Sequence, residues 1–390
     1  MQSNTSAVDR GDRPKVFIYK TDLLPLSETF IRDQGDALRD FDPRYVGLFK
    51  TTSHPSLSRM TDTVFYPRTP FHRIQAKVSM HTGRVQALSR LIRTPSTRPA
   101  LVHAHFLQSA MQIRISLAAQ KIPLVVTLHG QDVTSYPDSP SRLGSFGVRL
   151  RHTAIRDTLD QASLIIAVSE FIREKAIALG APSEKVIVHH IGTRIQAIQP
   201  SQPKKYDVLF VGRLVEKKGV ATLIDALSTV SKQMPVHAAI IGDGPLRTEL
   251  QRRATLSTAQ IDFLGSQSHE SVGELLLQSR LFCLPSQTAA NGDSEGLPMV
   301  LLEAMGARLP IVSTRHSGIP EAVISRETGL LSAEADSSGL AADILTILSD
   351  SRLASEYGLR GRERLETSFS LSTQTRLLEE HYRAVLAGVY

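Results

Sequence analysis

The sequence contains one cysteine and no tryptophan. A single cysteine excludes a disulfide within the chain, and Cys283, inside the apolar run Leu281–Leu284, is expected to be a small buried hydrophobe. No apolar run approaches the roughly 20 residues that a membrane span requires. Residues 1–13 are polar and charged, so we expect neither a secretory signal nor an anchor there. These absences fit a chain that works in the reducing cytoplasm.

The first half of the chain is also short of acidic residues. Residues 1–200 carry 26 Lys and Arg against 16 Asp and Glu, whereas residues 201–390 carry 19 against 22. A basic first half favours an anionic partner, either a membrane surface or a phosphorylated acceptor. Nucleic acid is not expected, because no basic stripe alternates with aromatic residues and no reader motif occurs.

Short β-branched runs alternate with helical patterns along the chain, as in parallel α/β sheets. A polar, proline-containing stretch at 196–205 interrupts this alternation and is typical of a linker. Two such α/β blocks predict two Rossmann-like domains that face each other across a cleft, at 1–198 and 199–370. The expected strands are 15–19, 45–48, 101–104, 124–128, 164–167, 186–189, 207–211, 238–241, 261–264, 281–284 and 311–313.

Two carboxylates, Glu295 and Glu303, stand eight positions apart in the segment Asn291–Gly306. The apolar run from Met299 predicts a helix, which puts Glu295 in the preceding loop and Glu303 about one turn inside. Carboxylates at these places can hold the hydroxyl groups of a ligand. An ordinary amphipathic helix with solvated glutamates is the competing interpretation, and spacing alone does not separate the two.

The start of this helix is a candidate phosphate site. Pro298 suits the first turn, because its missing N–H would be unbonded there. The N–H groups of Gly296 and Leu297 then lie at the positive end of the helix, where free N–H groups and aligned peptide dipoles bind phosphate. A nucleotide-sugar offers both a diphosphate for the amides and hydroxyl groups for the carboxylates.

Two cations follow a strand in the stretch Gly212–Gly219. They lie at the carboxyl edge of the predicted second sheet, where open α/β sheets bind their ligands. Arg213 can form forked hydrogen bonds to phosphate oxygens, and Lys218 supplies a compact positive charge. A solvated basic turn is the alternative, which the neighbouring glutamate motif disfavours.

A second glycine turn, Ile240–Pro245, also follows a strand of the second half. Gly242 places the backbone at the same sheet edge, but the turn fails as a dinucleotide fingerprint because Arg247 stands where the third glycine would be. A nicotinamide dehydrogenase is therefore disfavoured. Asp243 is expected to cap the next helix.

In the first half, His129 and Asp132 follow the predicted strand 124–128 at a His-Gly turn. A histidine at a strand end is often structural, and Asp132 has the chemistry either of a cap or of an acceptor contact. His103 and His105 share one face of a strand end. No third ligand at suitable spacing follows them, so we expect no metal.

The combined motifs resemble a known family. Residues 293–305, D-S-E-G-L-P-M-V-L-L-E-A-M, are similar to the E-x7-E signature of retaining glycosyltransferases of family 4, particularly those that assemble exopolysaccharides such as colanic acid. The G-R-L-x-x-x-K-G pattern at 212–219 is a hallmark of the same family. The resemblance implies a GT-B fold of the α/β class and a hexosyltransferase that moves a sugar, with retention, from a UDP- or GDP-sugar donor.

The resemblance also implies roles for individual residues. Arg213 and Lys218 would stabilise the departing diphosphate, Glu295 the sugar or the charge at its anomeric carbon, and His129 the transferred sugar. The donor would further contact Gly212, Gly242, Gly296, Leu297, Pro298 and Glu303.

On the acceptor side, the family usually has a glycine-rich loop after the first strand, where this sequence has Ser27 and Glu28. Together with Asp132, these are our candidates for the acceptor, which we expect to be a glycan carried on a lipid. The final helical segment, 371–386, is expected from the family to cross back to the first domain. No cofactor or metal is expected, since the nucleotide-sugar is a substrate.

A basic amphipathic pattern covers 71–93. Its apolar residues recur with helical spacing and arginines and lysines occupy the other faces, so one helix lying on an anionic membrane is one interpretation. A surface helix that packs its apolar stripe on its own sheet is the other. The apolar positions are Phe71, Ile74, Val78, Val85, Leu88 and Ile92.

Taken together, the sequence favours a glycosyltransferase of exopolysaccharide or lipopolysaccharide assembly, cytoplasmic and bound peripherally to the inner membrane face. Two rivals stay open. One is a phosphorylase or epimerase on the same fold, and the other is a glycan- or nucleotide-binding protein without catalysis.

Overall fold

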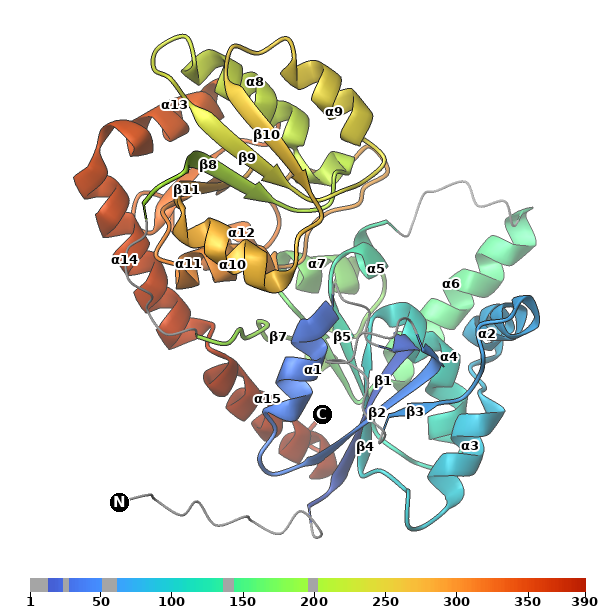
Figure 1. The fold of residues 1–390 in the computed structure, drawn as a ribbon. Coiled ribbons are helices and arrows are strands. Elements are labelled where there is room, and N and C mark those ends of the chain that lie inside the picture. The colour runs from blue at the N-terminus through green and yellow to red at the C-terminus, as the bar shows by residue number, and fades with distance from the viewer. Residues whose placement is uncertain (1–12, 24–27, 51–61, 136–143, 196–202) are drawn as a thin grey trace, which may run out of the picture.

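Two separate parallel sheets organise the chain (Figure 1). The computed structural model describes residues 13–23, 28–50, 62–135, 144–195 and 203–390, with the backbone alone for 144–148. Within this described part, one sheet has seven strands and the other has six. Strands buried on both faces and connected by helices are the arrangement that alternating βα patterns produce.

The first sheet has the strand order β3-β2-β1-β4-β5-β6-β7, all parallel. The order reverses at β1, so β1 and β4 flank the topological switch point where such sheets bind ligands. The strands are β1 (Lys15–Leu23), β2 (Asp42–Lys50), β3 (Thr63–Val64), β4 (Leu101–His105), β5 (Leu124–Leu128), β6 (Leu164–Ala167) and β7 (Val186–Val188).

Helices cover both faces of this sheet (Figure 1). Several begin at a capped residue: Thr69 accepts a hydrogen bond from the His72 N–H, and Ser169 accepts one from the Ile172 N–H. The helices are α1 (Thr29–Asp36), α2 (Pro70–Thr82), α3 (Gln86–Arg93), α4 (Leu107–Ala118), α5 (Gln131–Thr134), α6 (Gly144–Gln161) and α7 (Glu170–Ala178).

The second sheet has the order β10-β9-β8-β11-β12-β13, again all parallel. Its strands are β8 (Tyr206–Val211), β9 (His237–Ile241), β10 (Gln260–Gly265), β11 (Ser279–Leu284), β12 (Ile311–Thr314) and β13 (Gly329–Ser332). Its helices are α8 (Val220–Val230), α9 (Arg247–Ala254), α10 (His269–Leu277), α11 (Met299–Gly306), α12 (Ile319–Ala322), α13 (Ser337–Ser349) and α14 (Ser351–Ser368).

The last helix, α15 (Leu371–Leu386), returns to the first sheet (Figure 1). Its Tyr382 is fully buried, packs edge-on against Phe41 and places its hydroxyl 2.6 Å from Nδ1 of His103. A carboxylate oxygen of Glu379 accepts hydrogen bonds from the N–H groups of Arg39 and Asp40, at 2.6 and 2.7 Å. The C-terminal helix therefore ties the two halves together.

The structure corrects the single helix expected at 71–93. The chain breaks at Gly83, which ends α2 in the left-handed conformation with φ 65°. The two parts then differ. Val85 at the N-cap of α3 and Leu88 and Ile92 within it are buried, whereas the other predicted apolar positions, which lie on α2, are exposed. The spacing alone did not reveal this difference.

Two smaller expectations are also corrected. Asp243 does not cap α9, because that helix begins after Leu246 without a side-chain cap, and Asp243 instead pairs with Arg247 at 3.1 Å. The strand β13 and the two-residue strand β3 were not predicted. Most of the predicted linker, 196–202, lies outside the described residues.

Within the described residues, no helix combines the length and the apolar character needed to cross a membrane.

Candidate active site

The carboxyl ends of strands from both sheets bring the predicted site residues together. Gly212 follows β8 and Gly242 follows β9. Both residues still take part in the hydrogen bonds between neighbouring strands; the Gly212 N–H, for example, donates to the Ile241 carbonyl at 3.0 Å. The loop that carries Glu295 follows β11, and His129 follows β5 of the other sheet. These segments lie between the two domains (Figure 1).

Lys218 and Glu295 form an ion pair at the centre of this region. Lys218 Nζ lies 2.8 Å from Glu295 Oε1, and the two side chains are only 14% and 9% exposed. Burial acts to raise the pKa of Glu295, but the charges of Lys218 and Lys217, contact with Lys218 and nearby His316 together lower it below its usual value. Glu295 is therefore a carboxylate at neutral pH.

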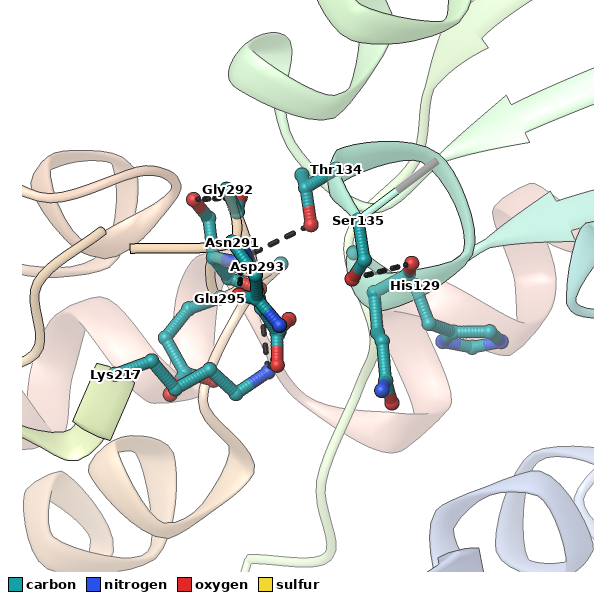
Figure 2. A network of polar contacts seen from close by, with 12 residues as sticks. His129, Thr134, Ser135, Lys217, Asn291, Gly292, Asp293 and Glu295 are labelled. Atoms are coloured by element: carbon teal, nitrogen blue, oxygen red, sulfur yellow. Dashed lines mark hydrogen bonds and ion pairs between the residues drawn. The ribbon is translucent and has the colours of Figure 1, made fainter. Parts of the chain in front are cut away.

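A second ion pair lies beside the first and was not foreseen. Lys217 Nζ lies 2.9 Å from Asp293 Oδ1 and 3.3 Å from the Ser294 carbonyl oxygen (Figure 2). The adjacent lysines of the basic turn were the available signal, but the sequence does not show which one faces which acid. The pair holds the loop before α11 against the turn after β8.

His316 is a further residue of the site that was not predicted from the sequence. The Glu295 N–H donates to its Nε2 at 3.1 Å, and its Nδ1 lies 2.6 Å from Glu334 Oε1. Because Nε2 accepts, the ring proton sits on Nδ1 and is directed at Glu334. His316 is nearly fully buried. It therefore fixes the backbone of Glu295, and its place two residues after the end of β12 was the signal in the sequence.

Helix α11 begins at the motif, as predicted, but Pro298 precedes its first turn instead of lying in it. Pro298 is its N-cap with ψ 112°, and Met299 is the first helical residue. Neither the Gly296 nor the Leu297 N–H donates a hydrogen bond to any residue that the structure describes. Glu303 lies one turn inside, 3.9 Å from His269, and burial raises its pKa although His269 acts to lower it.

His129 lies on the opposite side, in the first domain. It packs against the rings of Phe30 and Phe106, and its Nε2 is 3.1 Å from His105 Nδ1. Burial, with the charges of Lys20 and His103, lowers the pKa of His129 to about 3. His129 is therefore neutral, and its buried Nδ1 has no hydrogen-bond partner within the described chain.

The two domains touch at the motif itself. The Ser294 N–H donates to Oγ1 of Thr134 at 3.2 Å (Figure 2). Gly296 lies so close to the His129 carbonyl oxygen that a side chain at this position would overlap it. Glycine is therefore required here, and the backbone of His129 lies against the loop that carries Glu295.

Comparison with known proteins identifies this arrangement. Residues 193–364 match the family described as glycosyl transferases group 1, and residues 28–192 match the glycosyl transferase 4-like domain. Together these matches cover most of the chain. The chain is a group 1 glycosyltransferase.

Individual relatives agree with this assignment. The amylovoran biosynthesis glycosyltransferase AmsK of Erwinia amylovora is 30% identical over 321 residues, 77% of this chain and 76% of its own. A glycosyltransferase assigned to colanic acid biosynthesis, WcaL of Escherichia coli K12, is 30% identical over 235 residues, 58% of this chain and 57% of its own.

Among solved structures, Anabaena Alr3699/HepE in complex with UDP and glucose superposes on this glycosyltransferase with a TM-score of 0.74 and 21% sequence identity. The superposition covers 95% of this chain and 100% of that one. The fold is accordingly the GT-B fold, an α/β architecture of two Rossmann-like domains, as predicted.

The remaining predicted site residues of the glycosyltransferase differ in exposure and in the contacts that they make. Arg213 is exposed, and its guanidinium makes no hydrogen bond or ion pair with a described residue. Ser27 lies outside the described residues. Glu28 pairs with Lys20 at 2.6 Å, and burial raises its pKa despite that lysine.

Asp132 has a structural role, which was one of the two roles that the sequence left open. It is buried, and its carboxylate accepts hydrogen bonds from the N–H groups of His129, Gly130 and Leu107, at 2.9 to 3.0 Å. The side chain thus joins the turn after β5 to the start of α4 and orients His129. A contact with the acceptor stays a prediction.

In the described chain, no three His, Cys, Asp or Glu side chains lie together as a set that could hold a metal ion. His103 instead contacts Tyr382 and Thr127, each at 2.6 Å.

Proposed function

We propose that this glycosyltransferase moves a sugar from a nucleotide-diphosphate sugar, UDP- or GDP-linked, to a glycan acceptor with retention at the anomeric carbon. The ion pair of Lys218 and Glu295 at the start of α11 carries the proposal, because it joins the two predicted motifs in one buried place. The amylovoran and colanic acid relatives support a role in exopolysaccharide or lipopolysaccharide assembly.

The donor diphosphate would lie against Lys218, Arg213 and the free N–H groups of Gly296 and Leu297. The guanidinium of Arg213 has no partner in the described chain and is available for two oxygens of one phosphate. Negative charge develops on the diphosphate as the sugar departs, and preorganised donors of this kind lower that barrier. That a structural relative was solved with UDP and glucose supports such a donor.

The sugars of the donor would lie on either side of the diphosphate. Glu295, charged at neutral pH, would hold hydroxyl groups or stabilise positive charge at the anomeric carbon. His129, neutral and with a free Nδ1, would bind a hydroxyl group of the transferred sugar. Glu303, one turn into α11, would bind the ribose.

Retention would follow from attack on the face that the diphosphate leaves. The acceptor hydroxyl oxygen bonds to the anomeric carbon, the bond from that carbon to the phosphate oxygen breaks, and the acceptor proton passes to a phosphate oxygen. No protein base is needed on this route. We also propose that no metal or cofactor takes part, because Lys218 and Arg213 supply the positive charge.

The acceptor would be a glycan on a lipid, bound by the first domain beside Glu28 and Asp132. We propose that the enzyme works in the cytoplasm on the inner membrane face. Helix α2 supports this, since Phe71, Ile74 and Val78 lie on one helical face and are 71%, 63% and 51% exposed.

Product stereochemistry tests the proposal. UDP- and GDP-sugars are screened by thermal shift, the best donor is incubated with lipid-linked glycans in EDTA, and early product is analysed by proton NMR. We expect transfer with the anomeric configuration of the donor. An inverted product, or a requirement for added metal, would contradict the mechanism.

The same assay separates the rivals. Donor turnover without a glycan acceptor would indicate a phosphorylase if added inorganic phosphate gives a sugar phosphate, or an epimerase if an isomerised sugar forms. Tight donor binding without any turnover would indicate a binding protein.

A further inference from the structure

A polar groove of about 770 Å³ lies in the first domain, beside the candidate active site. It is lined by residues of β1, β2, α2, α4, α5 and α6 and of the loops between them, and its wall includes Phe106 and Asp132. Phe106 packs on His129 with ring centroids 4.4 Å apart, and Asp132 accepts from the His129 N–H. One end of the groove is therefore next to the residue proposed to contact the transferred sugar.

Five basic side chains line this groove, against three acidic ones. They come from four different elements or loops, so the local charge is not that of one helix face. The cations are Lys20, Arg68, Arg73, Lys77 and Arg151.

The three acids of the lining are already engaged. Asp22 pairs with Arg68 at 2.6 Å, Glu28 pairs with Lys20 at 2.6 Å, and Asp132 accepts three backbone N–H groups. Their charges are thus balanced by contacts inside the protein.

Arg73 and Lys77 are left over. They stand four residues apart on α2, so they lie on the same face of the helix, and both line the groove. Neither side chain forms a hydrogen bond or ion pair with a described residue. The sequence around them contains no Asp or Glu between Asp62 and Asp132. Two unpaired cations in a concave, acid-poor wall form a site for an anion.

We propose that this groove binds a phosphate ester of the acceptor, with Arg73 and Lys77 holding the phosphate and the glycan extending toward His129. This inference rests on the proposed function, and it narrows the acceptor to a phosphate-bearing class. Arginine can grip two phosphate oxygens and lysine a third. A dianionic phosphate or diphosphate matches two unpaired cations better than a single carboxylate does.

Direct binding tests the groove independently of catalysis. Isothermal calorimetry with citronellyl diphosphate, citronellol and inorganic pyrophosphate is run with the donor site saturated by UDP and GDP. We expect binding of the two phosphate compounds and none of citronellol. The Arg73→Ala, Lys77→Ala double variant is expected to weaken diphosphate binding about 100-fold, since each charged hydrogen bond contributes about tenfold.

A matched control removes the same charge elsewhere. Arg90 and Arg93 are exposed on α3, within the same acid-poor stretch but outside the groove lining. The Arg90→Ala, Arg93→Ala variant should bind the diphosphate as the wild type does. Equal weakening by both double variants would reduce the effect to general charge attraction and overturn the proposal, as would unchanged binding in the Arg73→Ala, Lys77→Ala variant.

The same experiments distinguish a lipid headgroup from free phosphate as the ligand, and they test the groove separately from the proposed function. Equal affinity for pyrophosphate and citronellyl diphosphate would assign the site to the phosphate alone, whereas tighter prenyl binding would assign it to a lipid headgroup. Binding that persists while no sugar is transferred would refute the proposed function and leave the groove assignment standing. Absence of phosphate binding in an enzyme that still transfers sugar would refute only the groove.

Discussion

At the scale of single residues, the setting of Glu295 distinguishes it from the solvated glutamate that its motif also allows. Its backbone is held by His316, its side chain is nearly buried, and its charge is balanced by Lys218. A buried carboxylate is costly unless it is paired, so the Lys218 contact is what keeps Glu295 ionised.

Replacing Glu295 by Gln removes the charge with little change in shape. We expect kcat to fall about 100- to 1000-fold, as for loss of one preorganised electrostatic group in an active site. The matched control is Asp293→Asn, which removes one charge from the adjacent ion pair with Lys217 and should change kcat far less. Steady-state transfer with the best donor measures kcat of both variants. Near-equal losses of kcat would show that Glu295 has no specific catalytic role.

The lowered pKa of Glu295 also predicts how its charge depends on pH. A carboxylate with a depressed pKa stays charged as the pH falls through the usual range of glutamate. Loss of activity in mildly acidic buffer would therefore have to come from another group.

At the scale of elements, a buried histidine network joins β4, β5 and α15. His103 contacts Thr127 and Tyr382 and stacks on His105, which in turn contacts His129. Burial lowers the pKa of His103 to about 3, and that of His129 to about 3. The folded protein thus holds these rings neutral.

This network predicts acid sensitivity. Below the ordinary pKa of about 6.5, the unfolded chain binds protons that the folded chain does not, so stability is complete above that pH and falls as the pH drops toward 3. Each such histidine lowers the free energy of unfolding by up to about 1.4 kcal/mol per pH unit.

Urea unfolding at pH 7.5 and 5.5, followed by circular dichroism, measures this slope. His103→Gln should reduce the difference between the two pH values, whereas His152→Gln, at an exposed position of α6, should not. A wild-type stability that does not change between the two pH values would contradict the account, even if the His103 variant fails to fold.

At the scale of the whole molecule, the exposed apolar face of α2 is the membrane-binding side that we propose for the first domain. We expect binding to vesicles that contain phosphatidylglycerol, weakened by salt because the surrounding side chains are basic. The Phe71→Ser, Ile74→Ser variant should bind about 10- to 100-fold more weakly, since each apolar side chain contributes about 1–2 kcal/mol when partly inserted.

Two exposed leucines of the second domain provide the control. Leu256 and Leu359 are 78% and 50% exposed, and changing both to Ser removes comparable apolar surface far along the chain from α2. Co-sedimentation with the vesicles compares the two variants. Equal losses would argue against an oriented membrane contact.

Much of the architecture was predictable because it is encoded locally. Strands β5 and β6 were predicted with the bounds that the structure has, since apolar runs between turn signals mark them. The motif that carries Glu295 and the basic turn with Lys218 were likewise visible, because glycine and proline punctuate both. Strand β3, with two residues, was too short for any pattern to indicate.

What the sequence by itself determined is the fold class, the family and the two motifs, because periodicity, turn residues and motif spacing all act over short distances along the chain. The tertiary structure alone decided which lysine pairs with Glu295 and that His316 supports it. It also decided that Asp132 holds the backbone of His129, and that the apolar pattern at 71–93 divides into one helix with an exposed apolar face and one with a buried apolar face. These outcomes depend on residues far apart in sequence that meet only when both sheets are folded, so no local pattern contains them.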